Sequence, residues 1–323
     1  MIMDSPLKEA SLSMASKANL PELLAHLQLI QPHLPRTLEL LHWQYFENPD
    51  GPTKIYTIRG SQDQKLHSML VVSPQKVRMQ DHVRNGHTMH DLMTHPDWRG
   101  RGYFHYLGEL AFREITERGD FTYTVPNELS QKGFQRAGWK RLFLVPSRMK
   151  VLGSSKSGDP NVTTVSEMSD PFTQACTEIW DQSGVGMGSC RSMEYLNWRY
   201  RKPGQVYRKF WVGDRQGFFI LKIYSDGSQK TLHILDLLVT KNARELIPGV
   251  LRFCEHYAYE NGAQTITAWL DREHFYSSYF DRAGLVMAER PTRWVNGNFE
   301  AFADQGAMDH ANWHITQGDS DVY

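Results

Sequence analysis

The sequence predicts an α/β fold made of two similar units in tandem, each a mixed, mostly antiparallel sheet flanked by helices. Two observations support this prediction. Three short segments recur in the same order, roughly 150 residues apart. Within each unit, strand-like alternation dominates the first part, and strands then alternate with amphipathic helical segments. Such alternation places helices on the faces of a sheet.

The repeat rests on three pairs of matching segments. They are Leu40–Tyr45 with Tyr195–Tyr200, Met89–Met93 with Ile234–Leu238, and Phe134–Trp139 with Phe280–Leu285. Their starting positions differ by 155, 145 and 146 residues, as two copies of one fold with a shorter loop in the second would give. A Gly-, Ser- and Pro-rich run separates the copies. We therefore expect a first domain at 1–151, a linker at 152–161 and a second domain at 162–323.

Periodicity and turn residues assign the elements of each copy in order. In the first copy we expect helices at 19–30 and 36–46, strands at 53–59, 66–73 and 87–94, a helix at 103–118, a strand at 121–125, a helix at 128–137 and a strand at 139–149. In the second copy we expect helices at 167–181 and 192–200, strands at 206–212, 217–224 and 231–239, a helix at 243–260, a strand at 264–269, a helix at 272–282 and a strand at 285–295.

The composition excludes several classes of protein. The chain has 36 Lys and Arg against 36 Asp and Glu, so it lacks the positive field on which nucleic-acid binding depends. No run approaches the ~18 apolar residues of a membrane span, and no secretory signal is recognisable. Three cysteines without a CxxC pair suit a reducing compartment. Strand alternation separates His87 from His90, which argues against a metal site. We expect a cytoplasmic protein without nucleic acid or metal.

The most informative segment joins a strand to a helix. The strand that contains Asp91 ends before Pro96, the turn Arg99–Gly102 follows, and an amphipathic helix begins at Tyr103. Glycines let backbone N–H groups approach a ligand closely, and the first helical turn adds unpaired donors and the positive end of its dipole. These groups would bind pyrophosphate oxygens. The alternative is an ordinary Gly-rich turn that caps the connection.

This segment resembles the acyl-CoA-binding motif of the GNAT N-acetyltransferase superfamily, Q/R-x-x-G-x-G/A after the fourth strand. Arg99 and Gly102 match its first and fourth positions, whereas Phe104 replaces the final small residue. The segment 127–139 resembles the family's later Asn…Gly-Phe element, and the resemblance spans 40–149. It implies that two splayed strands hold the pantetheine arm of acetyl-CoA or a longer acyl-CoA. The residues implied at the donor site are Leu92, Met93, Thr94, Arg99, Gly100, Arg101, Gly102, Tyr103, Phe104 and Asn127.

The second copy lacks this turn. After Asp236–Thr240 comes Lys241–Leu246, with no glycine before the helix. Backbone that must pass close to a pyrophosphate has lost its flexible residues there. The resemblance therefore implies a tandem GNAT protein in which the first copy binds the donor and the degenerate second copy helps to shape an acceptor cleft.

The proton donor to the departing thiolate is not the family's usual residue. In many GNAT enzymes a tyrosine four residues before the late glycine has this role, and Phe134 holds that position here. The acid would then be Tyr123, on the strand predicted beside the cleft, with Tyr103 and Ser130 as alternatives. A plain core aromatic is the other interpretation of Tyr123.

The general base has three candidates near the turn. Asp91 either relays a proton through water or is a buried structural carboxylate, and the matching Asp236 makes the structural role at least as plausible. His90 or His95 would titrate near neutral pH. The C-terminal segment 313–323 either completes the second sheet or brings its carboxylate into the first copy's site, as in some tandem GNAT aminoglycoside acetyltransferases.

The resemblance implies an acyl-CoA-dependent N-acyltransferase whose acceptor is an amine held between the copies: an amino sugar, a small amine, or a lysine or ornithine side chain of a peptide. Four methionines, at 69, 79, 89 and 93, either line a slot for a donor longer than acetyl or are ordinary core residues. One alternative is a non-catalytic CoA-binding or assembly module. Another is a tRNA-dependent peptidyl-type transferase, which the neutral charge disfavours. The sequence does not predict the oligomeric state.

Overall fold

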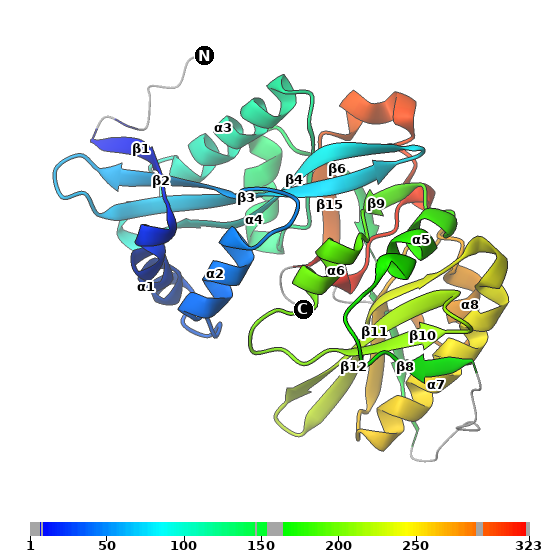
Figure 1. Ribbon diagram of the computed structural model, residues 1–323. Coiled ribbons are helices and arrows are strands. Elements are labelled where there is room, and N and C mark those ends of the chain that lie inside the picture. The colour runs from blue at the N-terminus through cyan, green and yellow to red at the C-terminus, as the bar shows by residue number, and fades with distance from the viewer. Residues whose placement is uncertain (1–6, 8, 146, 154–163, 289–292, 321–323) are drawn as a thin grey trace.

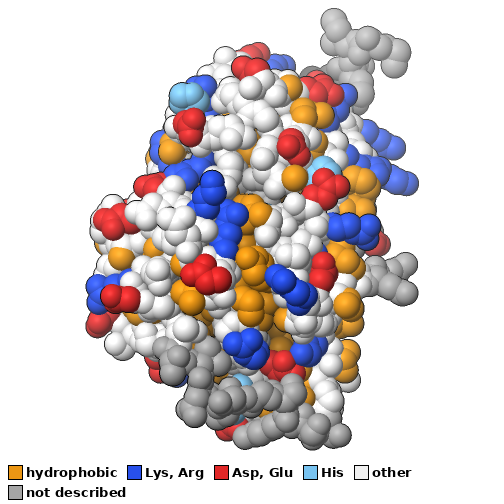
Figure 2. All heavy atoms as spheres, turned by 90° about the vertical axis from the view of Figure 1, so that its right-hand side faces the viewer, with side chains coloured by type: hydrophobic (Ala, Val, Ile, Leu, Met, Phe, Trp, Pro, Cys, Tyr) orange, Lys and Arg blue, Asp and Glu red, His pale blue; other side chains and the backbone are white. Residues whose placement is uncertain are grey.

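The computed structural model describes residues 7, 9–145, 147–153, 164–288 and 293–320. It confirms the α/β class: two mixed sheets lie next to each other, each with helices packed on it (Figure 1). No helix in the described ranges is long and apolar enough to span a membrane. Acidic and basic side chains are mixed across the face in Figure 2, in keeping with the zero formal charge.

The first sheet has eight strands in the order β1-β2-β3-β4-β5-β15-β6, with β9 paired to β3. Its strands are β1 (Ala10–Met14), β2 (Lys54–Gly60), β3 (Leu66–Met79), β4 (His82–Thr94), β5 (Phe121–Thr124), β6 (Lys140–Val145), β9 (Met187–Ser189) and β15 (Arg293–Gly297). All pairs are antiparallel except β4 with β5.

The second sheet has seven strands in the order β14-β7-β13-β12-β11-β10-β8. Its strands are β7 (Ser147–Val151), β8 (Val165–Glu167), β10 (Arg208–Val212), β11 (Gly217–Asp226), β12 (Gln229–Val239), β13 (Thr265–Trp269) and β14 (Val286–Met287). Only β12 and β13 pair in parallel. Each sheet therefore contains one parallel pair, at matching places in the two copies.

Eight α-helices and six short 3-10 helices occur in the described ranges. The α-helices are α1 (Leu20–Ile30), α2 (Leu38–Phe46), α3 (Tyr103–Glu117), α4 (Glu128–Arg136), α5 (Gln174–Gln182), α6 (Met193–Arg199), α7 (Ile247–Glu260) and α8 (Ser277–Arg282). The 3-10 helices are η1 (Lys17–Asn19), η2 (Pro96–Trp98), η3 (Lys241–Leu246), η4 (Phe299–Gln305), η5 (His310–Asn312) and η6 (Gln317–Asp319). Caps fix several starts: Thr37 accepts a hydrogen bond from the backbone N–H of Leu40, and Asn127 from that of Ser130.

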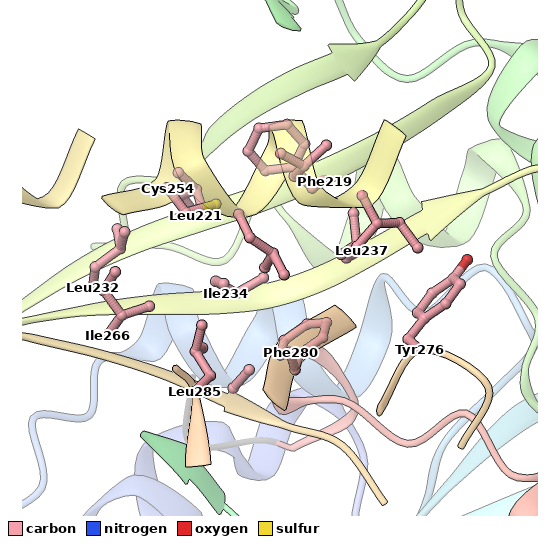
Figure 3. Close-up of a cluster of buried hydrophobic side chains, with 14 of the residues drawn as sticks. Phe219, Leu221, Leu232, Ile234, Leu237, Cys254, Ile266, Tyr276, Phe280 and Leu285 are labelled. Carbon is pink, nitrogen blue, oxygen red and sulfur yellow. The ribbon is translucent and has the colours of Figure 1, made fainter. Parts of the chain in front are cut away.

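Strand alternation divides each sheet's apolar side chains between two cores. On β3, Leu70 and Val72 pack with α3, whereas Val71 on the opposite face packs with α1 and α2. On β11, Phe219 and its neighbours pack with α7 and α8, as the close-up shows, and Phe218 packs with α5 (Figure 3). The central strands of both sheets are thus buried on both faces.

The two halves of the chain exchange strands. The strand expected at 139–149 is two strands, and the second of them, β7, pairs with β13 in the second sheet. In return, β15 lies between β5 and β6 in the first sheet, and β9 pairs with β3. The strand expected at 285–295 is likewise divided into β14 and β15. Most of the linker expected at 152–161 lies outside the described residues.

A pair of matched tryptophans joins the halves. Trp43 of α2 and Trp198 of α6, 155 residues apart, stack with ring centroids 5.0 Å apart. Each indole N–H donates to the other residue's backbone carbonyl, at 2.9 and 3.1 Å. This reciprocal contact is what two copies related by an approximate two-fold axis would make. The first pair of repeat segments therefore lies at the interface between the copies.

Candidate functional site

A cleft opens where β4 and β5 diverge. The two strands pair only at Gly86–Phe121 and His87–Thr122. Further along, the Thr124 hydroxyl donates to the carbonyl of Met89 at 3.3 Å. Beyond that contact a cavity of about 560 Å³ lies between the end of β4, the start of α3 and the segment that follows β5. We call this cavity the donor cleft, after the role that the sequence predicts for its lining residues.

A bulge in β4 bends the strand at the cleft. The register with β3 shifts between the pairs Met69–Met93 and Val71–His90. Asp91, within the shift, has a φ of 50°, which is unusual for a residue with a side chain. The bulge changes which side chains of β4 face the cleft, and alternation alone would not predict it.

Nine of the ten residues expected at the donor site line the cleft. They are Leu92, Met93, Thr94, Arg99, Gly100, Gly102, Tyr103, Phe104 and Asn127. Arg101 is the exception: its guanidinium lies 4.3 Å from the centre of the Trp98 ring and 3.7 Å from the Glu9 carboxylate. Because Arg101 is held by these partners, Arg99 is the cationic side chain of the turn that lines the cleft.

The turn before α3 has the backbone expected of an anion site. Gly100 and Gly102 have φ values of 77° and 82°, and Gly102 is the N-cap of α3. No atom lies within 4 Å of where a Cβ would stand on Gly100, so the backbone is open there. First-turn N–H groups of a helix bind phosphate oxygens in this geometry.

Phe104, the departure from the family motif, leaves the turn open. Its ring packs on α4, where a Cβ built on Gly133 would overlap the ring. It also meets Phe134 edge to face, with centroids 5.8 Å apart. Gly133 thus provides the space that a small residue at position 104 would otherwise supply.

A second, smaller cavity of about 100 Å³ adjoins the donor cleft. Its walls come from α2, β3, β4 and β5 of the first half, and from α6 and the C-terminal segment of the second half. Five residues line both cavities: Met89, His90, Thr124, Val125 and Ser320. The two cavities therefore meet at a point built from both copies, and we call the smaller one the acceptor cavity.

His90 lies at that meeting point with both ring nitrogens engaged. Its Nε2 is 2.7 Å from the Ser73 hydroxyl, and its Nδ1 is 3.2 Å from a carboxylate oxygen of Asp91 and 3.1 Å from the Gln44 amide. Its side chain is 9% exposed. Of the three predicted catalytic residues, only His90 lines both cavities.

Asp91 is a buried carboxylate with an ion-pair partner and a hydroxyl donor. Arg36 pairs with its carboxylate at 2.8 Å, and the Tyr45 hydroxyl donates to it at 2.7 Å. Burial alone would raise the pKa of this carboxyl, but the hydrogen bond from His90 and the charge of Arg36 hold the pKa well below its usual range. A carboxylate so stabilised in its ionised form is a poor proton acceptor at neutral pH.

The second half contains the same arrangement of aspartate, arginine and tyrosine. Asp236 pairs with Arg191 at 2.6 Å and accepts a hydrogen bond from Tyr200 at 3.3 Å. Arg191 and Tyr200 each lie 155 positions after Arg36 and Tyr45. The same Arg–Asp–Tyr group in both copies, only one of which has the donor turn, supports the structural interpretation of Asp91. His90 instead matches Leu235 and is specific to the first copy.

Tyr123 lies on β5 as expected but lines the acceptor cavity and not the donor cleft. Its hydroxyl is 2.7 Å from that of Ser189, which also accepts from the Gln75 amide at 2.6 Å. Burial raises its pKa well above the usual value, so the hydroxyl stays protonated. Tyr103 and Ser130 line the donor cleft. His95 accepts from the backbone N–H of Asp97 and lines neither cavity.

The C-terminal segment leads to this site, and its described residues, up to Ser320, form no strand. Arg191 binds both carboxylate oxygens of Asp319 at 2.9 Å, and Arg199 donates to the carbonyls of Gly318 and Ser320 at 2.8 and 2.7 Å. Ser320 then lines both cavities. The expected terminal carboxylate lies outside the described residues, which end at 320.

The described residues contain no group of His, Cys, Asp and Glu that could hold a metal ion. The methionine slot does not form, because Met69 and Met79 belong to two separate cores and only Met89 and Met93 line the donor cleft. Sequence reasoning missed Ser73, Gln44 and Arg36, although the repeat itself pairs Arg36 with Arg191.

No family model matches the chain, and no curated protein matches it in sequence. Solved structures do match its fold. A probable N-acyltransferase of unknown function from Enterococcus faecalis is 13% identical, with a TM-score of 0.64 over 89% of this chain and 71% of that one. A GCN5-related N-acetyltransferase from Anabaena variabilis is 14% identical, with a TM-score of 0.62 over 89% and 72%.

N-myristoyltransferase from Saccharomyces cerevisiae, solved with myristoyl-CoA, is 10% identical, with a TM-score of 0.58 over 90% of this chain and 82% of that one. All three matches extend over both sheets, since they cover nearly nine tenths of the chain or more. At such low identity they establish the architecture alone. The chain has the fold of the GCN5-related N-acetyltransferases.

Proposed function

We propose that the protein transfers an acyl group from an acyl-CoA to a primary amine. The observation that supports this most directly is the meeting of two cavities at His90, one beside an anion-binding turn and the other built from both halves. Direct transfer needs donor and acceptor to approach from two sides of one reacting carbon. The fold neighbours, which include acyltransferases, agree with this chemistry.

In this proposal the donor lies in the donor cleft. The N–H groups at Gly102–Phe104 bind the pyrophosphate with help from Arg99, and the pantetheine arm follows the diverging strands. The thioester then lies beside Met89 and Val125, where the cavities join. The amine attacks the thioester carbon, the N–C bond forms and the C–S bond breaks. His90 takes the proton that the amine loses.

The walls of the acceptor cavity suit a compact, uncharged, polyhydroxylated amine. They offer hydroxyl, amide and aromatic groups, from Gln44, Ser73, Gln75, Tyr195 and Trp198 among others. Among the described lining residues, the two with a formal charge already have partners. Asp319 is paired with Arg191, and Arg199 donates to two backbone carbonyls. Amides and aromatic rings bind sugar-like surfaces without needing a charge. An amino sugar is therefore the acceptor class that we favour over a lysine side chain.

Thiol release tests the proposal. Acetyl-CoA and longer acyl-CoAs are incubated with glucosamine, ethanolamine or a lysine peptide, and free CoA thiol is followed with and without each amine. We expect amine-dependent release, fastest with glucosamine, and a fall of about 10²–10⁴-fold in His90→Gln. A non-catalytic CoA-binding module would be stabilised thermally by CoA but would release no thiol with any amine. One CoA bound per chain is expected, because η3 in the second half follows no glycine turn.

A further inference from the structure

We propose that the Ser73 hydroxyl relays the acceptor's proton to His90, which makes Ser73 a second catalytic residue. The proposal rests on the proposed function, because it assigns a step at the same site. It follows from the hydrogen bonds around the imidazole. His90 is the group that would accept the proton, and both of its nitrogens are already engaged by neighbouring side chains.

The neighbours of Nδ1 fix the tautomer of His90. The ionised Asp91 carboxylate lies 3.2 Å from Nδ1 and therefore holds a proton on that nitrogen. The Gln44 amide, 3.1 Å away, can present its carbonyl oxygen to the same N–H after a half turn of its end group. Neutral His90 then has its lone pair on Nε2, which is the nitrogen that faces Ser73.

Ser73 occupies that lone pair. Its Oγ lies 2.7 Å from Nε2, a short distance for such a bond, and the residue is 5% exposed on β3. Ser73 lines the acceptor cavity and not the donor cleft. Its other hydroxyl contact is a longer one, at 3.3 Å, with Thr53. An amine that contacts the serine oxygen in this cavity is therefore connected through one hydrogen bond to His90 Nε2.

A hydroxyl both accepts and donates a proton, so the transfer balances. As the N–C bond forms, the amine proton moves to Ser73 Oγ and the serine proton moves to His90 Nε2. His90 becomes an imidazolium beside the Asp91 carboxylate, and the thiolate departs as the C–S bond breaks. Ser73 ends the step as it began. Asp91 acts here as a positioning residue that stays ionised throughout.

The tautomer can be measured without any acceptor. In protein with 15N-labelled histidine, the imidazole shifts of His90, assigned with the His90→Gln variant, report which nitrogen has the proton at neutral pH. We expect a proton on Nδ1 and none on Nε2. A neutral imidazole protonated on Nε2 would overturn the relay, because Ser73 could not hand its proton to that atom. This readout stays valid even if no amine in the panel is acylated.

Kinetics provide the second test, with acetyl-CoA and glucosamine as probes. We expect Ser73→Ala to lower single-turnover thiol release about 10²–10⁴-fold, the contribution usual for general acid–base groups, with CoA affinity unchanged. Ser73→Thr, which keeps a hydroxyl, should recover most of the rate. Thr57→Val, which removes a buried hydroxyl bonded to Ser13 on the neighbouring strand, is the folding control.

The outcomes separate the two proposals. Loss in Ser73→Ala with recovery in Ser73→Thr supports the relay. Full activity in Ser73→Ala together with a loss in His90→Gln refutes the relay and leaves the acyltransferase proposal standing. Absence of amine-dependent thiol release in the wild type refutes the acyltransferase proposal. The tautomer of His90 then tests the hydrogen bond between Ser73 and His90 independently of activity.

Discussion

Asp91→Asn should destabilise the fold before it impairs the chemistry. The substitution removes a buried charge that faces Arg36 at 2.8 Å, and the Arg36 side chain is only 11% exposed. Breaking a buried ion pair from one side typically costs 3–5 kcal/mol, because the remaining charge stays buried without its partner. The asparagine oxygen still accepts from Tyr45, so we expect a value near the lower end, about 3 kcal/mol.

Urea unfolding at several pH values measures this loss. The pKa of Asp91 is lower in the folded state than its unfolded value of about 3.9, so folding favours the ionised form. Its contribution is therefore complete above the unfolded pKa and is lost as the pH falls through the folded pKa. The difference between wild type and variant should be constant from about pH 5 to 8 and shrink below about pH 4.

A matched substitution in the second half is the control. In Asp236→Asn, Arg191 keeps its bidentate contact with Asp319, so the loss of stability should be smaller than in Asp91→Asn. Burial alone would raise the pKa of Asp236, but the charge of Arg191 and the hydrogen bond with His314 together lower it to about 2. An Asp91→Asn protein with wild-type stability would refute this reasoning, whatever its turnover, because Asp91 also positions the His90 ring and its loss would slow the proposed reaction in either case.

Three further predictions concern the two cavities. Gly102→Asp should abolish CoA binding in calorimetry and leave the circular dichroism spectrum unchanged. Gly102→Asn, which has the same φ strain but adds no charge, should retain measurable binding, and equal affinities of the two variants would contradict the pyrophosphate site. Tyr123→Phe should raise the KM for the amine and change kcat less than tenfold, because Tyr123 lines the acceptor cavity. A fall in kcat of about 10²–10⁴-fold at constant KM would instead identify Tyr123 as the acid that protonates the departing thiolate. Asp319→Asn should speed proteolysis of the C-terminal segment and lower turnover, and wild-type resistance would show that Arg199 alone anchors the segment.

The sequence predicts the local parts of this fold well. The helix over 103–118 and the turn before it are found at Tyr103–Glu117 and Gly100–Gly102, because periodicity and glycine positions are properties of adjacent residues. The repeat places Trp43 and Trp198 at matching positions but does not predict that they stack on each other. The strand exchange could not be predicted, because pairing of β7 with β13 is decided by which sheet edge is available after folding.

The candidate site also has local parts that the sequence predicts and long-range contacts that it does not. The turn Arg99–Gly102 is a contiguous motif, and nine of the ten residues that the sequence predicts for the donor site line one cavity. The contact between Ser73 and His90 joins two strands through a register that the β4 bulge shifts, and no spacing in the sequence predicts such a register. The short strand β9, only Met187–Ser189, has too few residues for alternation to be read, yet it places Ser189 against Tyr123.

The repeated Arg–Asp–Tyr group has different neighbours in the two copies. In the first half, the aspartate of this group adjoins His90, which matches Leu235 in the second half. In the second half, Arg191 binds Asp319 as well as Asp236 and so fixes the C-terminal segment. That segment ends, among the described residues, at Ser320 on the wall of both cavities. In the proposed reaction, the second half therefore contributes by holding the C-terminal segment against the cavities of the first half, which requires the two halves to fold together.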